Sequence, residues 1–238
     1  MTFTQIYMEM SIEDWKKNTN KEIEHWDMVL SGFKNNPDSY FHEYVKKRIN
    51  YELPIQKNIS ELFKNINSDP ISILDVGSGP LPFLGRKSNK RVSVSAIDIL
   101  ANEYYKLYEK YQVYPPNAPI SIDAINIESH YVKNAFDIVY ARNSIDHTHD
   151  PIRCIKNMIY VSKKYVMLEH KINEGEIEAY QGLHQWNFNT KNNKFYITDK
   201  QKNENCINDI FNTVKINCYI TEEEEEKIKD WLIIIIEI

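Results

Sequence analysis

Short apolar runs alternate with helical stretches in the middle of the chain, and this alternation predicts an α/β fold. The apolar stretches rich in β-branched residues favour five strands, at ISILDV (71–76), RVSVSAID (91–98), PISIDA (119–124), FDIVYA (136–141) and KYVMLEH (164–170). Between the fourth and fifth, the apolar residues of DPIRCIKNMIYVS (150–162) recur at helical spacing. Strands that alternate with helices indicate parallel βαβ units joined by right-handed crossovers.

The two ends of the chain have different patterns. Residues 11 to about 66 predict three helices, the second capped by Ser39 and stopped by Pro54. Near the C-terminus, TVKINCYI (213–220) and WLIIIIEI (231–238) predict two strands with no crossover helix, so we expect them to pair antiparallel. The polar stretch 189–205 predicts a mobile loop or an insertion.

Composition fits one soluble protein of this class and disfavours several functions. The chain has 238 residues, of which 42% are hydrophobic, and a formal net charge of −5, whereas a nucleic-acid-binding surface is normally basic. The three cysteines share no metal-ligand spacing. We see no secretory leader, and the apolar run at 231–238 is too short to cross a bilayer. These features predict a cytoplasmic protein with neither a membrane span nor a nucleic-acid partner.

Glycines follow the first predicted strand in ILDVGSGP (73–80). A glycine after a strand permits a turn with positive φ, and a second lets a ligand approach the backbone, as in nucleotide-binding loops. The dinucleotide pattern needs a third glycine where Pro82 stands, and the phosphate-loop pattern lacks its Gly-Lys-Ser/Thr. Asp98, at the end of the second strand, lies near the roughly 20-residue spacing expected of a ribose-binding acid.

Four stretches in order, ILDVGSGP, AIDIL, SIDAIN and FDIVYARNSIDH, resemble motifs I to IV of the class I S-adenosylmethionine (SAM) dependent methyltransferases. The resemblance covers residues 71–170 and implies SAM as the cofactor. It also implies a Rossmann-like α/β fold with a seven-stranded, mainly parallel sheet, a C-terminal antiparallel strand pair and an N-terminal helical extension. The residues that it places on SAM are Asp75, Gly77 and Gly79 (methionine portion), Asp98 (ribose), Asp123 and Ala124 (adenine), and Arg142 and Asn143 (cofactor lining).

Each assignment has a structural alternative. The glycines could form an ordinary tight turn, Asp123 could cap a turn or helix, and Arg142 could be a surface charge. We expect residues 1–66 to form a helical cap on a compact SAM-binding unit at 67–238. On that cap, Arg48 is the predicted clamp for the cofactor carboxylate, with Trp26, Tyr40 and Tyr44 facing the cleft or joining the helices to the sheet.

Two histidine-containing stretches follow the fourth and fifth strands and are candidates for activating the methyl acceptor. In NSIDHTHDP (143–151), His147 is a candidate general base, with helix capping or packing as the alternative. In GLHQWNF (182–188), His184 is the second candidate, with Gln185 for hydrogen bonding and Trp186 for stacking. Histidines 147, 149, 170 and 184 together with Glu169 match no compact metal signature, so we predict no metal site.

The same two stretches, with the helical extension, are similar to methyltransferases of bacterial surface-polysaccharide and sugar-nucleotide clusters. The similarity implies O-methylation of a sugar, a sugar nucleotide or a capsule substituent such as a phosphoramidate. Three alternatives stay open: methylation of another small molecule, a nucleotide-binding enzyme of the NAD type, and a SAM-binding partner subunit without activity. The sequence leaves the oligomeric state open.

Overall fold

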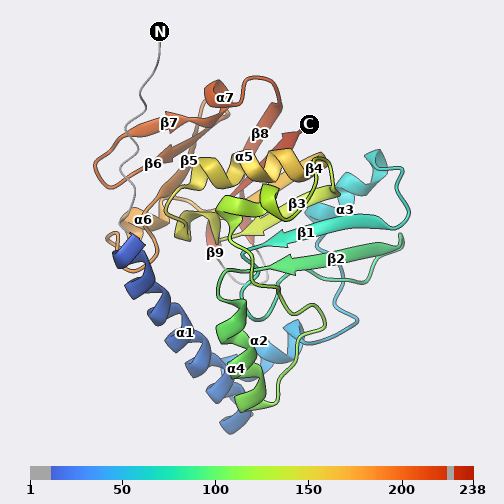
Figure 1. Cartoon of the computed structure of the whole chain (residues 1–238), viewed down its shortest axis with the longest axis vertical. Helices are drawn as coiled ribbons and strands as arrows, with labels where there is room; N and C mark the ends of the chain where they lie inside the picture. The colour runs from blue at the N-terminus through green and yellow to red at the C-terminus, as the bar shows by residue number, and fades with distance from the viewer. Residues whose placement is uncertain (1–11, 224–227) are drawn as a thin grey trace.

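The computed structural model describes residues 12–223 and 228–238, and a six-stranded sheet forms its centre (Figure 1). The strand order is β2-β1-β3-β4-β9-β8, in which the first four strands are parallel and β9 is antiparallel to both of its neighbours. The parallel core and the antiparallel C-terminal pair are therefore confirmed. The bounds are β1 (Ile71–Val76), β2 (Val92–Ile97), β3 (Phe136–Arg142), β4 (Ser162–Lys171), β8 (Lys215–Glu223) and β9 (Ile228–Glu237).

Helices cover both faces of the sheet. Alternate residues of β1 point to opposite sides: Leu74 packs with α5 (Pro151–Val161), and Ile73 packs with α3 (Lys57–Leu62) and the 3-10 turn η1 (Phe63–Asn65). Burial on both faces explains why the central strands read as continuous apolar runs. The crossover to β3 contains α4 (Ala101–Tyr111) and η2 (Ala124–Ser129).

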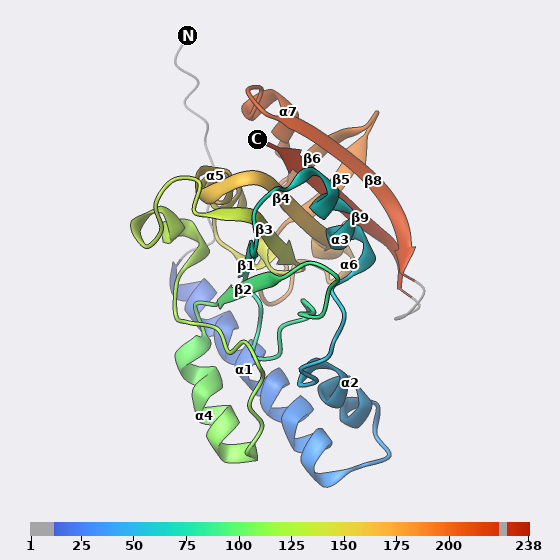
Figure 2. The same ribbon diagram turned by 90° about the vertical axis from the view of Figure 1, so that its right-hand side faces the viewer.

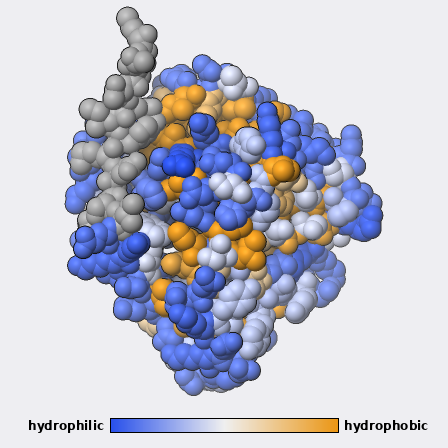
Figure 3. Space-filling view, viewed as in Figure 1, coloured by the Kyte–Doolittle hydropathy of each residue, from blue (hydrophilic) through white to orange (hydrophobic). Residues whose placement is uncertain are grey.

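A third apolar cluster joins α1 (Ile12–Asn35) and α2 (Tyr40–Arg48) to α4. Figures 1 and 2 place these three helices together at one end of the molecule. The Ser39 side chain accepts a hydrogen bond from the His42 backbone N–H, so the predicted cap of the second helix is confirmed. No helix in the described ranges is long and apolar enough to cross a membrane. Figure 3 shows that apolar patches on the surface are bordered by hydrophilic residues.

The predicted strand at 119–124 does not form. The segment meets β2 only at an isolated bridge between Ile97 and Ile120, and Ile120 is half exposed. Pro119 has no N–H to extend the ladder, and Asp123 starts η2 three residues beyond the bridge. Within the described residues the main sheet thus has six strands rather than seven.

Of the two alternatives for 189–205, a mobile loop or an insertion, the loop is wrong, because most of this region forms a separate antiparallel sheet. Its strands are β5 (Asn187–Lys191), β6 (Lys194–Thr198) and β7 (Glu204–Cys206). Asn192 and Asn193 both have positive φ, which is the turn geometry that suits a two-residue hairpin. Phe195 and Ile197 bury one face of β6 against the main core. Because the region is mostly polar, the alternating buried residues of β6 were not recognised in the sequence.

Candidate active site

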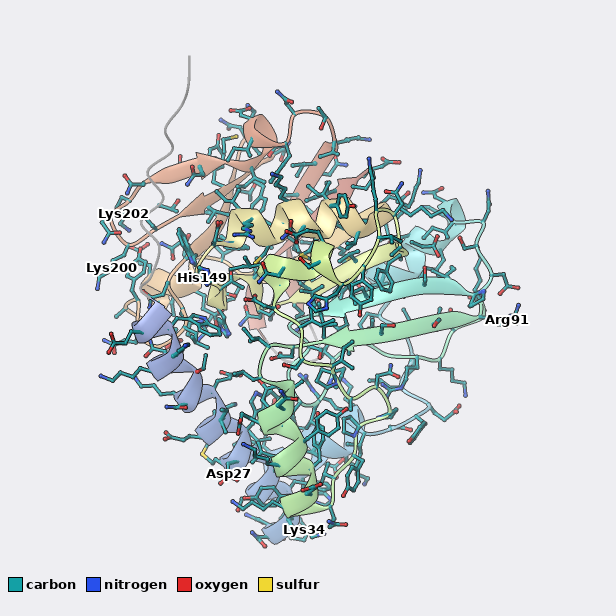
Figure 4. The ribbon with its side chains drawn as sticks, viewed as in Figure 1. Asp27, Lys34, Arg91, His149, Lys200 and Lys202 are labelled. Atoms are coloured by element: carbon teal, nitrogen blue, oxygen red, sulfur yellow. The ribbon has the colours of Figure 1, made fainter. Side chains whose placement is uncertain are left out.

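A cavity of about 630 Å³ lies at the carboxyl ends of β1 to β4, beneath one face of α1. Its volume is within the range of about 300–1,000 Å³ found for small-molecule sites. Figure 4 shows His149 at this end of the strands and Arg91 at the opposite end. The residues predicted to bind the cofactor or to act in catalysis all line the cavity: Arg48, Asp75, Gly77, Gly79, Asp98, Asp123, Ala124, Arg142, Asn143, His147 and His184.

The glycine loop is shaped by close contacts within the protein as well as by its backbone angles. Gly77 and Gly79 both have a φ of +65°, as expected for this turn. A Cβ atom on Gly77 would lie 2.6 Å from the Cβ atom of Ser144, and one on Gly79 would lie 3.3 Å from the Trp26 ring. The Asp98 carboxylate accepts hydrogen bonds from the backbone N–H groups of Gly79 (3.0 Å) and Leu100 (2.9 Å). Asp98, which follows β2, therefore holds in place the glycine loop that follows β1.

Asp75 and Asp98 are both buried carboxyl groups at this edge of the sheet. Burial raises the pKa of Asp75 to about 7, against an opposing effect of Arg48. Burial likewise raises the pKa of Asp98 to about 6, although the two backbone hydrogen bonds lower it. Asp75 Oδ2 has no hydrogen-bond partner among the described residues. A cationic or N–H-bearing ligand group beside Asp75 would supply the missing partner.

Two of the predicted cofactor residues also have structural roles. Asp123 caps η2 by accepting a hydrogen bond from the Ile125 N–H at 3.0 Å, so the capping alternative is correct, and its side chain still lines the cavity. Asn143 has a φ of +46°, and its side-chain oxygen accepts from the Lys171 N–H at 3.3 Å. Asn143 thus ties the end of β3 to the end of β4.

Arg142 is not a surface charge, because it pairs with the buried Glu169 at 2.7 Å. Its guanidinium lies between two aromatic rings, 3.9 Å from the centroid of Phe83 and 4.1 Å from that of Trp231. The Tyr140 hydroxyl donates to the same Glu169 oxygen at 2.7 Å. Sequence reasoning did not predict this cluster, because its members come from four separate segments.

The N-terminal helices form the cover of the cavity. Arg48 donates to the Leu81 carbonyl oxygen at 3.0 Å and lies 4.1 Å from the centre of the Tyr44 ring. Trp26 lies against the glycine loop and donates to a Glu22 carboxylate oxygen at 2.8 Å. Trp26, Tyr44 and Arg48 line the cavity, and Trp26 and Tyr44 also pack in the cluster that joins the helices, whereas Tyr40 is 70% exposed and does not line the cavity.

The two candidate catalytic histidines meet at the cavity wall. His147 Nε2 lies 3.1 Å from His184 Nδ1, although 37 residues separate them in the chain. The buried Asp146 joins them: its Oδ2 atom lies 3.3 Å from His184 Nδ1 and 3.5 Å from His147 Nε2. Sequence reasoning named His147 and His184 but left out Asp146, whose position before His147 was the only available signal.

Charge couples the members of this cluster. Burial alone would raise the pKa of Asp146, but the charges of His147 and His170 and the hydrogen bond from His184 hold it far below its usual range. Burial lowers the pKa of His184, yet the contact with Asp146 and the charge of Glu174 raise it above its usual value. The cluster therefore contains a buried carboxylate next to a histidine whose pKa is above its usual value.

Residues around the histidines anchor the loops rather than contacting an acceptor. Trp186 is buried, and its ring N–H donates to the Thr148 carbonyl oxygen at 2.8 Å. The Gln185 side chain donates to the carbonyl oxygens of Tyr180 and Gly182, both at 2.9 Å. The predictions that Trp186 stacks on an acceptor and that Gln185 binds one are therefore wrong. Both side chains are committed to holding the loop that carries His184.

Comparisons with known proteins agree with this architecture. The sequence model of the family described as "Methyltransferase domain" matches residues 43–201. A search of curated proteins found no match. Among solved structures, magnesium protoporphyrin IX methyltransferase (ChlM) from Synechocystis PCC 6803 with bound SAH is similar over 94% of this chain and 99% of that chain, with 13% identity and a TM-score of 0.51. The plantazolicin methyltransferase BpumL in complex with SAH has the same coverage and identity and a TM-score of 0.50.

The fold and the family match together define the class. Since the matched residues make up more than half of the chain, the protein belongs to the methyltransferase domain family. It is a SAM-dependent methyltransferase. At 13% identity, the two solved structures indicate a shared fold and not a shared acceptor.

Proposed function

We propose that the protein transfers the methyl group of SAM to a hydroxyl group of a small polar acceptor. The observation that supports this most directly is the pair of His147 and His184 in the wall of the cavity that also contains the glycine loop, with the buried Asp146 in contact with both. A hydroxyl is a weak nucleophile that reacts faster once it has lost its proton. An imidazole group in contact with a carboxylate can accept that proton.

The residues at the glycine loop fit SAM. Asp75 offers a buried oxygen without a partner, which suits the ammonium group of the methionine portion. Asp98 already accepts two backbone N–H bonds through separate oxygens, and each oxygen keeps a lone pair for a ribose hydroxyl. Arg48 supplies a positive charge on the cavity wall for the cofactor carboxylate. When bound, SAM supplies the electrophilic methyl group.

The acceptor side has a different chemistry from the cofactor side. His147, His184, Glu174 and Lys171 line it and offer several hydrogen-bonding groups. A sugar or sugar nucleotide, which presents many hydroxyls, fits such a wall, and this supports the O-methylation that the sequence predicts. The helices within residues 1–66 act in this proposal as the cover that excludes water from the methyl-transfer site of residues 67–238.

Calorimetric titration with SAM, S-adenosylhomocysteine and NAD tests the cofactor assignment. Both adenosyl ligands should bind and NAD should not. Replacing Asp98 by alanine should weaken SAM binding at least tenfold, since a hydrogen bond to a charged group contributes about 1.5–3 kcal/mol. Binding of NAD without binding of SAM would overturn the proposal, and unchanged SAM affinity in Asp98→Ala would refute the ribose assignment.

Turnover tests the acceptor side. The protein is incubated with labelled SAM and a panel of sugars, sugar nucleotides and non-sugar small molecules, and products are screened by mass spectrometry for a gain of one methyl. The His147→Ala and His184→Ala variants should lower turnover and leave SAM affinity nearly unchanged. Full activity in both variants would show that the acceptor hydroxyl is activated elsewhere, and methylation of non-sugar acceptors alone would exclude the sugar assignment.

A further inference from the structure

We propose that Asp146, His147 and His184 form a binding site for one first-row divalent metal ion such as Zn²⁺ or Co²⁺. The inference deepens the proposed function, on which it rests for the role of the metal but not for its binding. It also replaces the prediction from sequence spacing that the chain has no metal site.

The geometry of three donor atoms points to a metal. Asp146 Oδ2, His147 Nε2 and His184 Nδ1 are separated pairwise by 3.1, 3.3 and 3.5 Å. Ligands bound at about 2.0–2.1 Å to one metal lie about 3.0 Å apart in octahedral geometry and about 3.4 Å apart in tetrahedral geometry. The three atoms thus already form one face of a coordination polyhedron.

Hydrogen bonding alone satisfies this arrangement poorly. His184 Nδ1 faces both His147 Nε2 and Asp146 Oδ2, and one ring nitrogen carries at most one proton. A proton on that nitrogen can serve only one of its two neighbours well. A cation at the centre would bind the lone pairs of all three atoms at once.

A second observation comes from buried carboxylate oxygens near the cluster. Asp146 Oδ1 and Glu174 Oε2 have no hydrogen-bond partner within the described part of the chain, and the two side chains are only 2% and 10% exposed. Glu174 Oε2 lies 3.7 Å from His184 Nδ1. His170 Nδ1 lies 3.3 Å from Asp146 Oδ1 without hydrogen-bond alignment, and a slight rotation would make it the outer partner that metal-binding carboxylates usually have.

Donor chemistry selects the kind of metal. Two imidazoles and one carboxylate suit Zn²⁺, Co²⁺ or Fe²⁺, whereas Mg²⁺ and Ca²⁺ prefer oxygen ligands alone. Three protein ligands on one face leave positions open towards the cavity, where an acceptor hydroxyl oxygen can bind. A cation held by these three residues would act as a Lewis acid that lowers the pKa of an acceptor hydroxyl, whose proton would pass to water before methyl transfer. The two imidazoles would then activate the acceptor through the metal and not as general bases.

Metal binding is measured directly on the full chain. After chelator treatment and dialysis, Co²⁺ is titrated while its visible absorption is recorded, and bound metal is counted by plasma mass spectrometry. We expect one Co²⁺ per chain, displaced by Zn²⁺ and not by Mg²⁺. Replacing a ligand in His184→Ala or Asp146→Asn should weaken binding more than about 100-fold, since loss of an outer partner alone costs 10–100-fold.

His149→Ala is the matched control, because His149 lies in the same loop and lines the same cavity but is not one of the three ligands. It should bind Co²⁺ as the unmodified protein does. Wild-type binding no stronger than that of the His147→Ala/His184→Ala variant would overturn the inference.

Titration with S-adenosylhomocysteine separates the metal proposal from the proposed function. If S-adenosylhomocysteine binds and Co²⁺ does not, only the metal site is refuted. If Co²⁺ binds and S-adenosylhomocysteine does not, only the cofactor assignment is refuted. Thermal unfolding verifies that Asp146→Asn is folded, and His184→Ala, at a partly exposed position, provides the test if it is not.

Discussion

Replacing Asp75 by asparagine should stabilise the fold near pH 8 while weakening the binding of SAM. Asp75 is buried, one of its oxygens has no partner, and burial raises its pKa from 3.8 to about 7. Near pH 8 the folded protein must therefore hold a buried negative charge at this position that Arg48 compensates only in part. In the proposed function, that charge is retained because the cofactor's ammonium group pairs with it.

The size of the effect follows from the two pKa values. The interval from 3.8 to about 7 is roughly three pH units, and each unit corresponds to about 1.4 kcal/mol, which gives about 4 kcal/mol as an upper bound. The asparagine amide is also buried and costs about 1–3 kcal/mol where it lacks partners. We expect a net stabilisation of about 1–3 kcal/mol near pH 8.

The sign of the pH dependence gives the sharper test. A carboxyl whose pKa is raised by folding contributes its stability fully below 3.8, and this contribution is lost as the pH rises to about 7. The Asp75→Asn advantage should therefore be large near pH 8 and shrink near pH 5. Urea unfolding followed by tryptophan fluorescence measures the difference at both values.

Asp137→Asn is the matched control, because Asp137 is equally buried on the neighbouring strand but is fully hydrogen-bonded. It accepts from the Ser68 hydroxyl and from both the N–H and the hydroxyl of Ser72, and its pKa is lowered by these bonds despite its burial. This substitution should destabilise the protein near pH 8. If Asp75→Asn also destabilises it there, by the same amount as near pH 5, the reasoning about a buried, partly compensated charge is wrong.

Two further predictions concern the supports of the cavity. Arg142→Ala should destabilise the protein by about 3–5 kcal/mol in urea unfolding, because Glu169 is left buried without its cation, and the Arg142→Met/Glu169→Gln variant should recover most of the loss; equal stability of both variants would contradict this. Gly77→Ala should cost more than Gly182→Ala in thermal unfolding, since both glycines have positive φ but only the first would bring a Cβ atom against Ser144; equal losses would show that the contact with Ser144 is unimportant.

The sequence predicted the parallel core and the glycine-loop side of the cavity well, because both depend on local patterns. A buried strand, its following loop and the acid at the end of the next strand are each visible within a few residues, as with Gly77 and Asp98. The failures arose where tertiary context decided the structure. The apolar run at 119–124 lies beyond β2, the edge strand of the main sheet, and meets it only at an isolated bridge. The region 189–205 forms a hairpin with buried Phe195 and Ile197, although its sequence is mostly polar.

The side of the cavity that contains His147 and His184 was predicted less completely for the same reason. His147 and His184 were named from residue type and nearness to strand ends, but their mutual contact spans 37 residues and needs the hairpin that the sequence hid. The partners of Arg142 come from distant segments, so its pairing with Glu169 left no local signal. Histidines far apart in a chain show no ligand spacing, however close they lie after folding.

The cavity wall with the glycine loop and the wall with His184 are supported by different parts of the fold. The glycine loop and Asp98 continue the strands of the main sheet, whereas the loop carrying His184 is fastened to the start of β5, where Asn187 accepts from the Glu176 N–H at 2.8 Å and donates to the Tyr180 hydroxyl at 2.7 Å. Substitutions in one wall can therefore leave the hydrogen bonds of the other in place. In the proposed function, exchanging residues 174–206 for those of a relative, with Glu174 and His184 retained, should change the choice of acceptor and leave the glycine loop and Asp98 unaltered.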